Sequence, residues 1–142
     1  MNLTVQIEKA IELLVKNFNP IAIYLFGSAS RNELRKDSDI DIAFLTDYNI
    51  KIDPYTCFMK SQELADIFNR DIDLIHLNSS STVFKAQVVG NGKLIYCSDN
   101  TKRMYFEMYA LKDYAFLNEE REVILKNIKE SGTVYGKWCD FK

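Results

Sequence analysis

Two aspartates stand two residues apart at the start of an apolar segment, Asp39-Ile40-Asp41-Ile42-Ala43-Phe44-Leu45. Alternate side chains of a β-strand project from opposite faces, so a strand here would place Asp39 and Asp41 on one face. Two neighbouring carboxylates repel each other and are costly to bury without a partner. A cation would remove that cost, and hard oxygen ligands suit Mg²⁺ that carries the phosphates of a substrate. The spacing therefore predicts a metal site.

A glycine and a serine end the apolar run that precedes these aspartates. Residues 21–26 are apolar, Gly27-Ser28 follows, and a polar connection of ten residues leads to Asp39. Glycine allows a tight turn and the close approach of a ligand to the backbone. Ser28 offers a hydroxyl and a backbone N–H to a phosphate oxygen. We therefore expect a nucleotide-phosphate site that faces the metal site.

The combined pattern resembles the signature of the DNA polymerase β-like nucleotidyltransferases, which consists of Gly-Ser, ten residues and Asp-x-Asp, here Gly27, Ser28, Asp39 and Asp41. The sequence is most similar to the minimal nucleotidyltransferase (MNT) antitoxins, because the chain is short, Arg31 follows the turn and Ser38 precedes the first aspartate. Those proteins are partners of HEPN-domain ribonuclease toxins.

The resemblance implies a role for each matching residue. Gly27 and Ser28 would hold the β- and γ-phosphates of a nucleoside triphosphate, and Ser38 joins this nucleotide-binding set. Asp39 and Asp41 would ligate two Mg²⁺ ions. Arg31 would contact a phosphate or support the turn, although an ordinary surface arginine explains it equally well.

A third carboxylate is needed to complete one metal's coordination and to accept the proton of the attacking hydroxyl. The segment Asp71-Ile-Asp73-Leu-Ile-His-Leu offers two candidates on one strand face, and the spacing alone does not choose between them. The resemblance favours Asp73, since the family places its third acid directly before an apolar strand segment. His76 points to the opposite face, and we expect it to be a packed strand residue.

Composition narrows the class of protein. With 142 residues, 47% of them hydrophobic, the chain is long enough for one domain with its own core. A net charge of −2 gives no general electrostatic case for binding nucleic acid. The three cysteines lie far apart and form no CxxC pair, which predicts a cytoplasmic protein. We find no signal peptide and no membrane-spanning run in the sequence, so we expect a protein that does not enter a membrane.

The periodicities predict an α/β (α+β) fold, and the resemblance implies the polymerase β-like nucleotidyltransferase type. We expect a small mixed sheet of three or four strands, helices on one face, and a long C-terminal helix. Residues 1–98 would form the nucleotidyltransferase core, and residues 99–142 a helical extension of the same domain. The expected helices are 3–18, one that starts at Asp53-Pro54, 83–89 and 99–130, and the expected strands are 21–26, 39–45, 71–77 and 93–97. The buried face of the second helix is expected to consist of Cys57, Phe58, Ser61, Leu64, Ala65 and Phe68.

The long C-terminal helix carries apolar residues almost all round, more than one core-facing stripe needs. They are Tyr105, Phe106, Met108, Tyr109, Leu111, Tyr114, Phe116 and Leu117. A helix buried within this domain would explain them, and so would a second apolar face that docks a partner chain. We favour the partner-binding interpretation.

The resemblance then predicts the function. Similar proteins transfer AMP from ATP to a tyrosine hydroxyl of the cognate HEPN ribonuclease, so we expect a Mg²⁺-dependent protein adenylyltransferase that forms a hetero-oligomer with its toxin. One alternative is a non-catalytic antitoxin that acts by complex formation and occlusion. Another is transfer to a small molecule, which is disfavoured because no second domain remains to build a pocket for such an acceptor.

Overall fold

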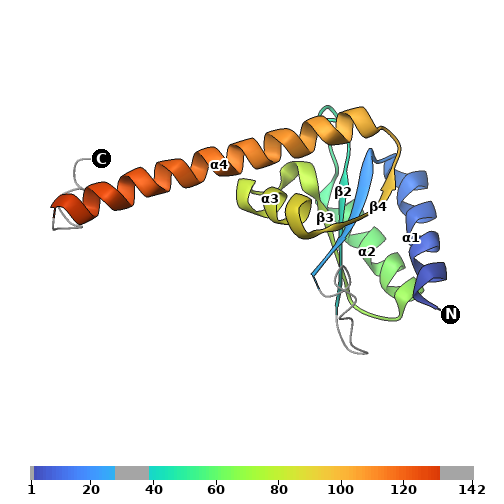
Figure 1. Ribbon diagram of the computed structural model, residues 1–142. Helices are drawn as coiled ribbons and strands as arrows, with labels where there is room; N and C mark the ends of the chain where they lie inside the picture. Colours follow the sequence, from blue (N-terminus) through green and yellow to red (C-terminus); the bar gives the residue numbers. More distant parts are fainter. Residues whose placement is uncertain (1, 28–38, 132–142) are drawn as a thin grey trace.

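The computed structural model describes residues 2–27 and 39–131. Its elements follow one another in the order α1 (Leu3–Phe18), β1 (Ala22–Phe26), β2 (Ile40–Leu45), α2 (Pro54–Phe68), β3 (Ile72–His76), the short 3₁₀ helix η2 (Leu77–Ser79), α3 (Thr82–Asn91), β4 (Lys93–Cys97) and α4 (Asn100–Ser131) (Figure 1). Every helix and strand predicted from periodicity is present, with ends that agree to within two residues. The expected fold class is confirmed.

One mixed sheet of four strands has the order β3-β2-β1-β4. Strand β1 is antiparallel to both β2 and β4, whereas β3 runs parallel to β2. The register sets Phe26 at the end of β1 opposite Asp41, and aligns Asp41 with Asp73 across the parallel pair. The sheet therefore brings these two aspartates, 32 residues apart in sequence, to neighbouring positions.

Helices cover both faces of the sheet, which corrects the expectation of helices on one face. Alternate residues of β2 such as Ile42 join α1 and α2 in one apolar cluster. The residues between them, such as Ala43, join Val88 of α3 and Phe106 of α4 in a second cluster. Because β1 is apolar on both sides, each of its faces needs such a cover. Figure 1 shows the resulting three-layer arrangement.

The ends of the helices follow from local chemistry. The side chains of Asn2, Asp53 and Ser81 each accept a hydrogen bond from a backbone N–H in the first turn of α1, α2 and α3. Asn19 and Asn69 end α1 and α2 in the left-handed conformation, which asparagine tolerates better than most residues. These caps fix where the intervening strands begin.

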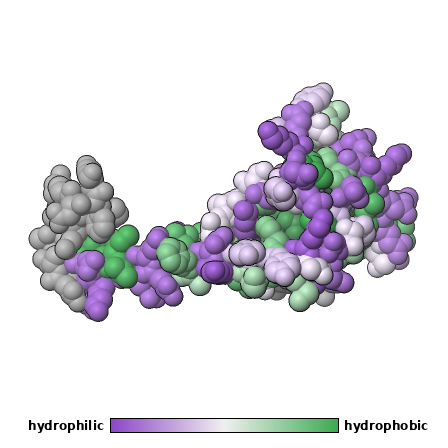
Figure 2. Space-filling view, turned by 90° about the horizontal axis from the view of Figure 1, so that it is seen from above, coloured by the Kyte–Doolittle hydropathy of each residue, from purple (hydrophilic) through white to green (hydrophobic). Residues whose placement is uncertain are grey.

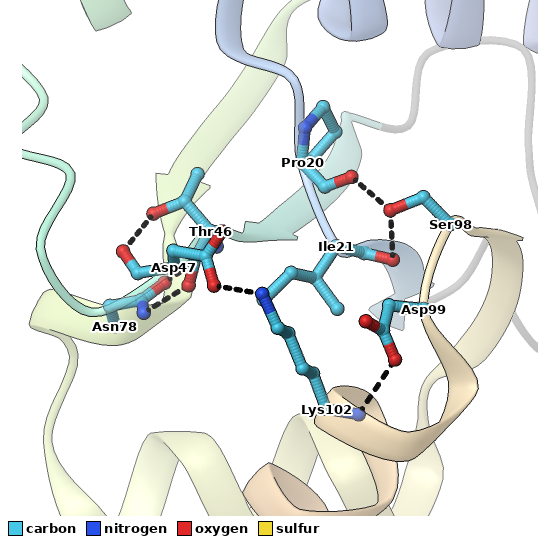
Figure 3. A network of polar contacts seen from close by, with 8 residues as sticks. All are labelled: Pro20, Ile21, Thr46, Asp47, Asn78, Ser98, Asp99 and Lys102. Atoms are coloured by element: carbon cyan, nitrogen blue, oxygen red, sulfur yellow. Dashed lines mark hydrogen bonds and ion pairs between the residues drawn. The ribbon is translucent and has the colours of Figure 1, made fainter.

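A polar network joins β2 to the segment after β3. The side chain of Asn78 makes two hydrogen bonds to the backbone of Thr46. Its Oδ1 accepts from the Thr46 N–H at 2.9 Å, and its Nδ2 donates to the Thr46 carbonyl at 2.7 Å (Figure 3). The hydroxyl of Thr46 also lies 2.8 Å from Nε2 of His76. Asn78 thus continues the contact between β2 and β3 two residues beyond the last pair, Phe44 and His76, through a side chain.

The base of α4 is anchored on the same end of the sheet. Lys102 Nζ forms an ion pair with Asp47 Oδ1 at 2.8 Å, and its backbone N–H donates to Asp99 (Figure 3). The buried Tyr24 hydroxyl donates to Glu107 Oε1 at 2.8 Å. Beyond these contacts α4 runs past α3 and projects from the domain as a single helix (Figure 1). In the described part of the chain, no helix is long and apolar enough to cross a membrane.

Candidate active site

Gly27 stands directly after β1 and lies against the carboxylate of Asp41. Its φ of +73° belongs to the left-handed region, which side-chain-bearing residues rarely adopt. A Cβ at this position would lie 2.6 Å from Oδ2 of Asp41, a separation that real Cβ atoms do not show. Only glycine therefore allows the turn and the carboxylate to approach so closely.

The side chains of Asp41 and Asp73 lie side by side across the parallel pair of strands, close enough for Asp73 to raise the pKa of Asp41. Burial, together with the neighbouring carboxyl of Asp73 and the charge of Asp39, raises the pKa of the half-buried Asp41 from 3.8 to about 6. Asp39 and Asp73 are exposed. Negative charge is thus concentrated at this rim of the sheet, next to the Gly27 turn.

These carboxylates fit a divalent cation. Because the charges of Asp73 and Asp39 both raise the pKa of Asp41, the site carries an excess of negative charge that a cation would neutralise. Within residues 2–27 and 39–131, no three acidic, histidine or cysteine side chains already form a metal-binding cluster. Mg²⁺ commonly takes only one or two carboxylates and completes its coordination with water and substrate phosphates. The Asp41–Asp73 pair meets that requirement.

The structure brings Gly27, Asp41 and Asp73 together, and it places a fourth predicted site residue, Asp39, just before β2, where its charge still acts on Asp41. The other three, Ser28, Arg31 and Ser38, lie outside the described residues. Of the two candidates for the third acid, Asp73 is the one aligned with Asp41. Asp71 precedes β3, and its backbone carbonyl accepts a hydrogen bond from Ile40 at 3.0 Å.

His76 is a packed strand residue, as expected. Its ring lies parallel to that of Phe44, with centroids 5.2 Å apart, on the α1–α2 side of the sheet. Burial lowers its pKa, and its two ring nitrogens face the hydroxyls of Thr46 and Ser79. These contacts explain His76 without a catalytic role.

A groove beside the acidic rim was not foreseen from the sequence. It has a volume of about 390 Å³ and is formed by α2 and β3, with the lining residues Pro54, Cys57, Phe58, Ser61, Gln62, Ile72, Asp73 and Leu74. Phe58 was expected in the core but is 59% exposed. The buried stripe of α2 runs through Ser61, Leu64 and Phe68, and Phe58 turns away from it towards the groove.

Comparison with known proteins establishes the family. Residues 8–101 match the family described as "Polymerase beta, Nucleotidyltransferase". The match covers well over half of the 142 residues, and the four-stranded mixed sheet agrees with it. The chain belongs to the polymerase β-type nucleotidyltransferases.

Two relatives show which members of the family this chain resembles. The protein adenylyltransferase MntA of Shewanella oneidensis is 35% identical over 121 residues, which span 84% of this chain and 85% of the relative. A protein of the same name from Aphanizomenon flos-aquae is 29% identical over 130 residues, 86% of this chain and 87% of the relative. The expected similarity to MNT antitoxins is confirmed.

Solved structures agree in fold. A toxin–antitoxin crystal structure with AMP-PNP superimposes with a TM-score of 0.76 at 34% identity, covering 86% of this chain and 97% of the solved one. A complex of the tri-AMPylated Shewanella oneidensis HEPN toxin with its MNT antitoxin gives a TM-score of 0.72 at 32% identity, covering 89% and 98%.

Proposed function

We propose that this protein is an antitoxin that transfers AMP from ATP to a tyrosine of its cognate HEPN ribonuclease toxin and forms a complex with that toxin. The observation that carries the proposal is the pair of carboxylates, Asp41 and Asp73, which are aligned on neighbouring strands beside the Gly27 turn. The relatives named protein adenylyltransferase, and the solved complex of an AMPylated HEPN toxin with its MNT antitoxin, support it. AMP on a tyrosine adds bulk and negative charge, which would block RNA binding at the toxin's catalytic residues.

In this proposal each residue of the rim has a role. Gly27 and Ser28 hold the β- and γ-phosphates, with Arg31 and Ser38 as further nucleotide contacts. Asp39, Asp41 and Asp73 would hold two Mg²⁺ ions, which when bound neutralise the charge of the triphosphate and stabilise the attacking and leaving oxygens. The excess negative charge at Asp41 supports this part of the proposal.

The reaction is a displacement at the α-phosphorus of ATP. The phenolic oxygen of the acceptor forms a bond to the α-phosphorus, and the bond from that phosphorus to the α–β bridging oxygen breaks. Pyrophosphate leaves with that oxygen, and the phenolic proton passes to the carboxylate of Asp73. Asp73 suits this task because it lies at the outer strand, exposed and next to Asp41. The rest of the site contributes positioning and charge neutralisation.

Residues 99–142, and α4 in particular, would dock the toxin. Apolar side chains of α4 remain exposed in the described chain: Met104, Tyr105, Met108, Tyr109, Leu111, Phe116, Val123 and Leu125. Figure 2 shows apolar side chains along the arm of α4 that projects beyond the domain. Exposed apolar surface of this kind marks an interaction site more often than a solvated helix. The arm extends beyond the domain core, so we expect a partner chain to bury its apolar side chains.

The decisive experiment incubates the purified chain with labelled ATP, Mg²⁺ and the toxin encoded beside it. We expect label on a toxin tyrosine, located by mass spectrometry, and no label with the double variant Asp39→Ala/Asp41→Ala. An unlabelled toxin in the presence of the wild-type chain would refute the proposed activity.

The alternative function is inhibition of the toxin by complex formation alone, without AMP transfer. The exposed apolar side chains of α4 favour this alternative. Rescue of cells from the toxin separates the two mechanisms. If the Asp39→Ala/Asp41→Ala variant still binds the toxin but no longer rescues growth, chemistry is required. Full rescue by that variant would instead establish occlusion.

A further inference from the structure

The strand registers place three side chains in one row across the sheet. Phe26 of β1 is the antiparallel partner of Asp41 of β2, and Asp41 is aligned with Asp73 of β3. Residues directly opposite each other in an antiparallel pair project from the same face, with Cβ atoms about 5 Å apart. The ring of Phe26 therefore starts beside the carboxylate that the proposed function assigns to the metal ions.

A second aromatic ring meets Phe26 on this face of the sheet. Ile42 packs towards α1 and α2, so its neighbour Asp41 points to the side that α3 and α4 cover. Phe26 and Phe84 of α3 both pack against the apolar cluster on that side, which includes the buried Val88. Their rings meet edge to face, with centroids 5.2 Å apart and planes inclined at 84°. The two rings form an aromatic wall on the inner side of the acidic rim.

This wall has the chemistry to hold a planar ring. An edge-to-face contact uses one face of one ring at most, and both Phe26 and Phe84 are only half-buried. Phenyl rings offer no hydrogen-bonding group, so their contribution to binding is apolar contact and stacking. Nucleobases stack on aromatic side chains in this way. A nucleobase is therefore a ligand that matches the wall.

The direction of the proposed reaction distinguishes the nucleobase from the acceptor tyrosine. With the β- and γ-phosphates at the Gly27 turn and the metal ions at Asp41 and Asp73, the line from leaving group to attacking oxygen runs from β1 to β3. The attacking hydroxyl then enters at β3, two strands or about 10 Å from Phe26. The ester oxygen that carries the nucleoside leaves the α-phosphorus at the side of this line. A nucleoside that turns inward over the sheet meets the ring of Phe84.

We propose that Phe84 stacks on the adenine base of ATP, and that Phe26 holds the Phe84 ring in position. The proposal deepens the proposed adenylyltransferase function and rests on it, because it takes from it the place of the triphosphate at the Gly27 turn. Phe84 then determines how tightly the nucleoside is held, whereas the rim of carboxylates and the turn hold the phosphates.

The test compares Phe84→Leu with Phe84→Tyr and with a control at Phe106. The leucine keeps an apolar side chain in the cluster but removes the ring, and the tyrosine keeps the ring. Phe106 packs against the same cluster from α4, but it lies with Leu45 at the end of β2 away from the acidic rim. Phe106→Leu is therefore a matched loss of a half-buried ring away from the proposed base.

Two ligands separate the base from the phosphates. Calorimetry measures the binding of Mg²⁺·AMP-PNP and, by competition, of Mg²⁺·tripolyphosphate, which carries no nucleoside. We expect Phe84→Leu to bind AMP-PNP about tenfold more weakly and tripolyphosphate within about twofold of the wild type. Phe84→Tyr and Phe106→Leu should bind both ligands within about threefold of the wild type. Photolysis of bound 8-azido-ATP should attach the base at or next to residue 84, as located by mass spectrometry.

The contrary results are distinct from one another. Unchanged AMP-PNP affinity in Phe84→Leu, an equal loss of both ligands, or a photolabel remote from residue 84 would overturn the base contact. A raised KM for the toxin with unchanged AMP-PNP affinity would assign the wall to the acceptor and overturn it as well. A wild-type chain that shows the expected pattern of binding but labels no toxin would remove the proposed AMP transfer and leave the base contact in place.

Discussion

The substitution Asp41→Asn should make the cation-free protein more stable at neutral pH. The pKa of Asp41 is raised from an ordinary 3.8 to about 6 by burial and by the neighbouring carboxylates, so the fold favours its neutral form. Between these two pKa values the folded state binds more protons than the unfolded chain, and stability falls as the pH rises through the interval. Above about pH 6 Asp41 is ionised in the folded protein, and the loss of stability is complete. An amide in place of the carboxylate removes that loss.

The expected gain follows from the size of the pKa change. One pKa unit corresponds to about 1.4 kcal/mol, so a rise from 3.8 to about 6 sets a ceiling of about 3 kcal/mol. Asp41 is only half-buried, and water screens part of the repulsion. We therefore expect Asp41→Asn to raise the free energy of unfolding by about 1 kcal/mol at pH 7, and to leave it close to the wild-type value below pH 4.

Urea unfolding in EDTA, followed by circular dichroism, measures this difference. The control is Asp71→Asn, which removes an exposed carboxylate just before the neighbouring strand β3 and should change little. Mg²⁺ with AMP-PNP should then stabilise the wild type, because a ligand that binds only the folded state adds to its stability, and should stabilise Asp41→Asn much less. An Asp41→Asn variant that is no more stable than the wild type at pH 7 would show that the carboxylates do not repel as argued.

Three further substitutions test other parts of the structure. Gly27→Ala forces a Cβ to within 2.6 Å of Asp41 Oδ2, so Mg²⁺·AMP-PNP affinity, measured by calorimetry, should fall about tenfold or more while the chain still folds. Asn78→Ala leaves the backbone of the buried Thr46 without two hydrogen bonds and should lower the free energy of unfolding in urea by about 2 kcal/mol. Phe116→Ser, at a side chain 62% exposed, should change stability by no more than about 0.5 kcal/mol but weaken toxin binding about tenfold in calorimetry.

The sequence predicted those parts of the site that depend on local geometry. The Gly27-Ser28 pair marked the end of β1, and the alternation of apolar residues after Asp39 marked β2 with Asp41 inside it. The alignment of Asp41 with Asp73 could not be derived from spacing, because α2 separates the two strands in sequence and only the parallel register brings them together. The resemblance to a family supplied that choice.

Features that depend on packing between distant segments were missed. The ion pair of Lys102 with Asp47 joins residues 55 apart in sequence, and no pattern along α4 marks it. Phe58 was assigned to the core because it is apolar and adjacent to Cys57 on the helix. At 100° per residue, however, one step is enough to carry a side chain from the buried stripe to its margin. The groove between α2 and β3 follows from that one rotation.

The acidic rim and the helix proposed to dock the toxin share one face of the sheet. Ile42 and Leu74 pack on the side of α1 and α2, so the alternating side chains of Asp41 and Asp73 point to the side covered by α3 and α4. A toxin docked on α4 would therefore reach the rim without passing round the edge of β3. Phe116 on the projecting arm and Gly27 at the rim have no shared partner, and distant substitutions of this kind are additive in free energy. The losses of kcat/KM in Phe116→Ser and Gly27→Ala should thus multiply in the double variant. A double variant no slower than the worse single variant would mean that docking and nucleotide binding are not independent.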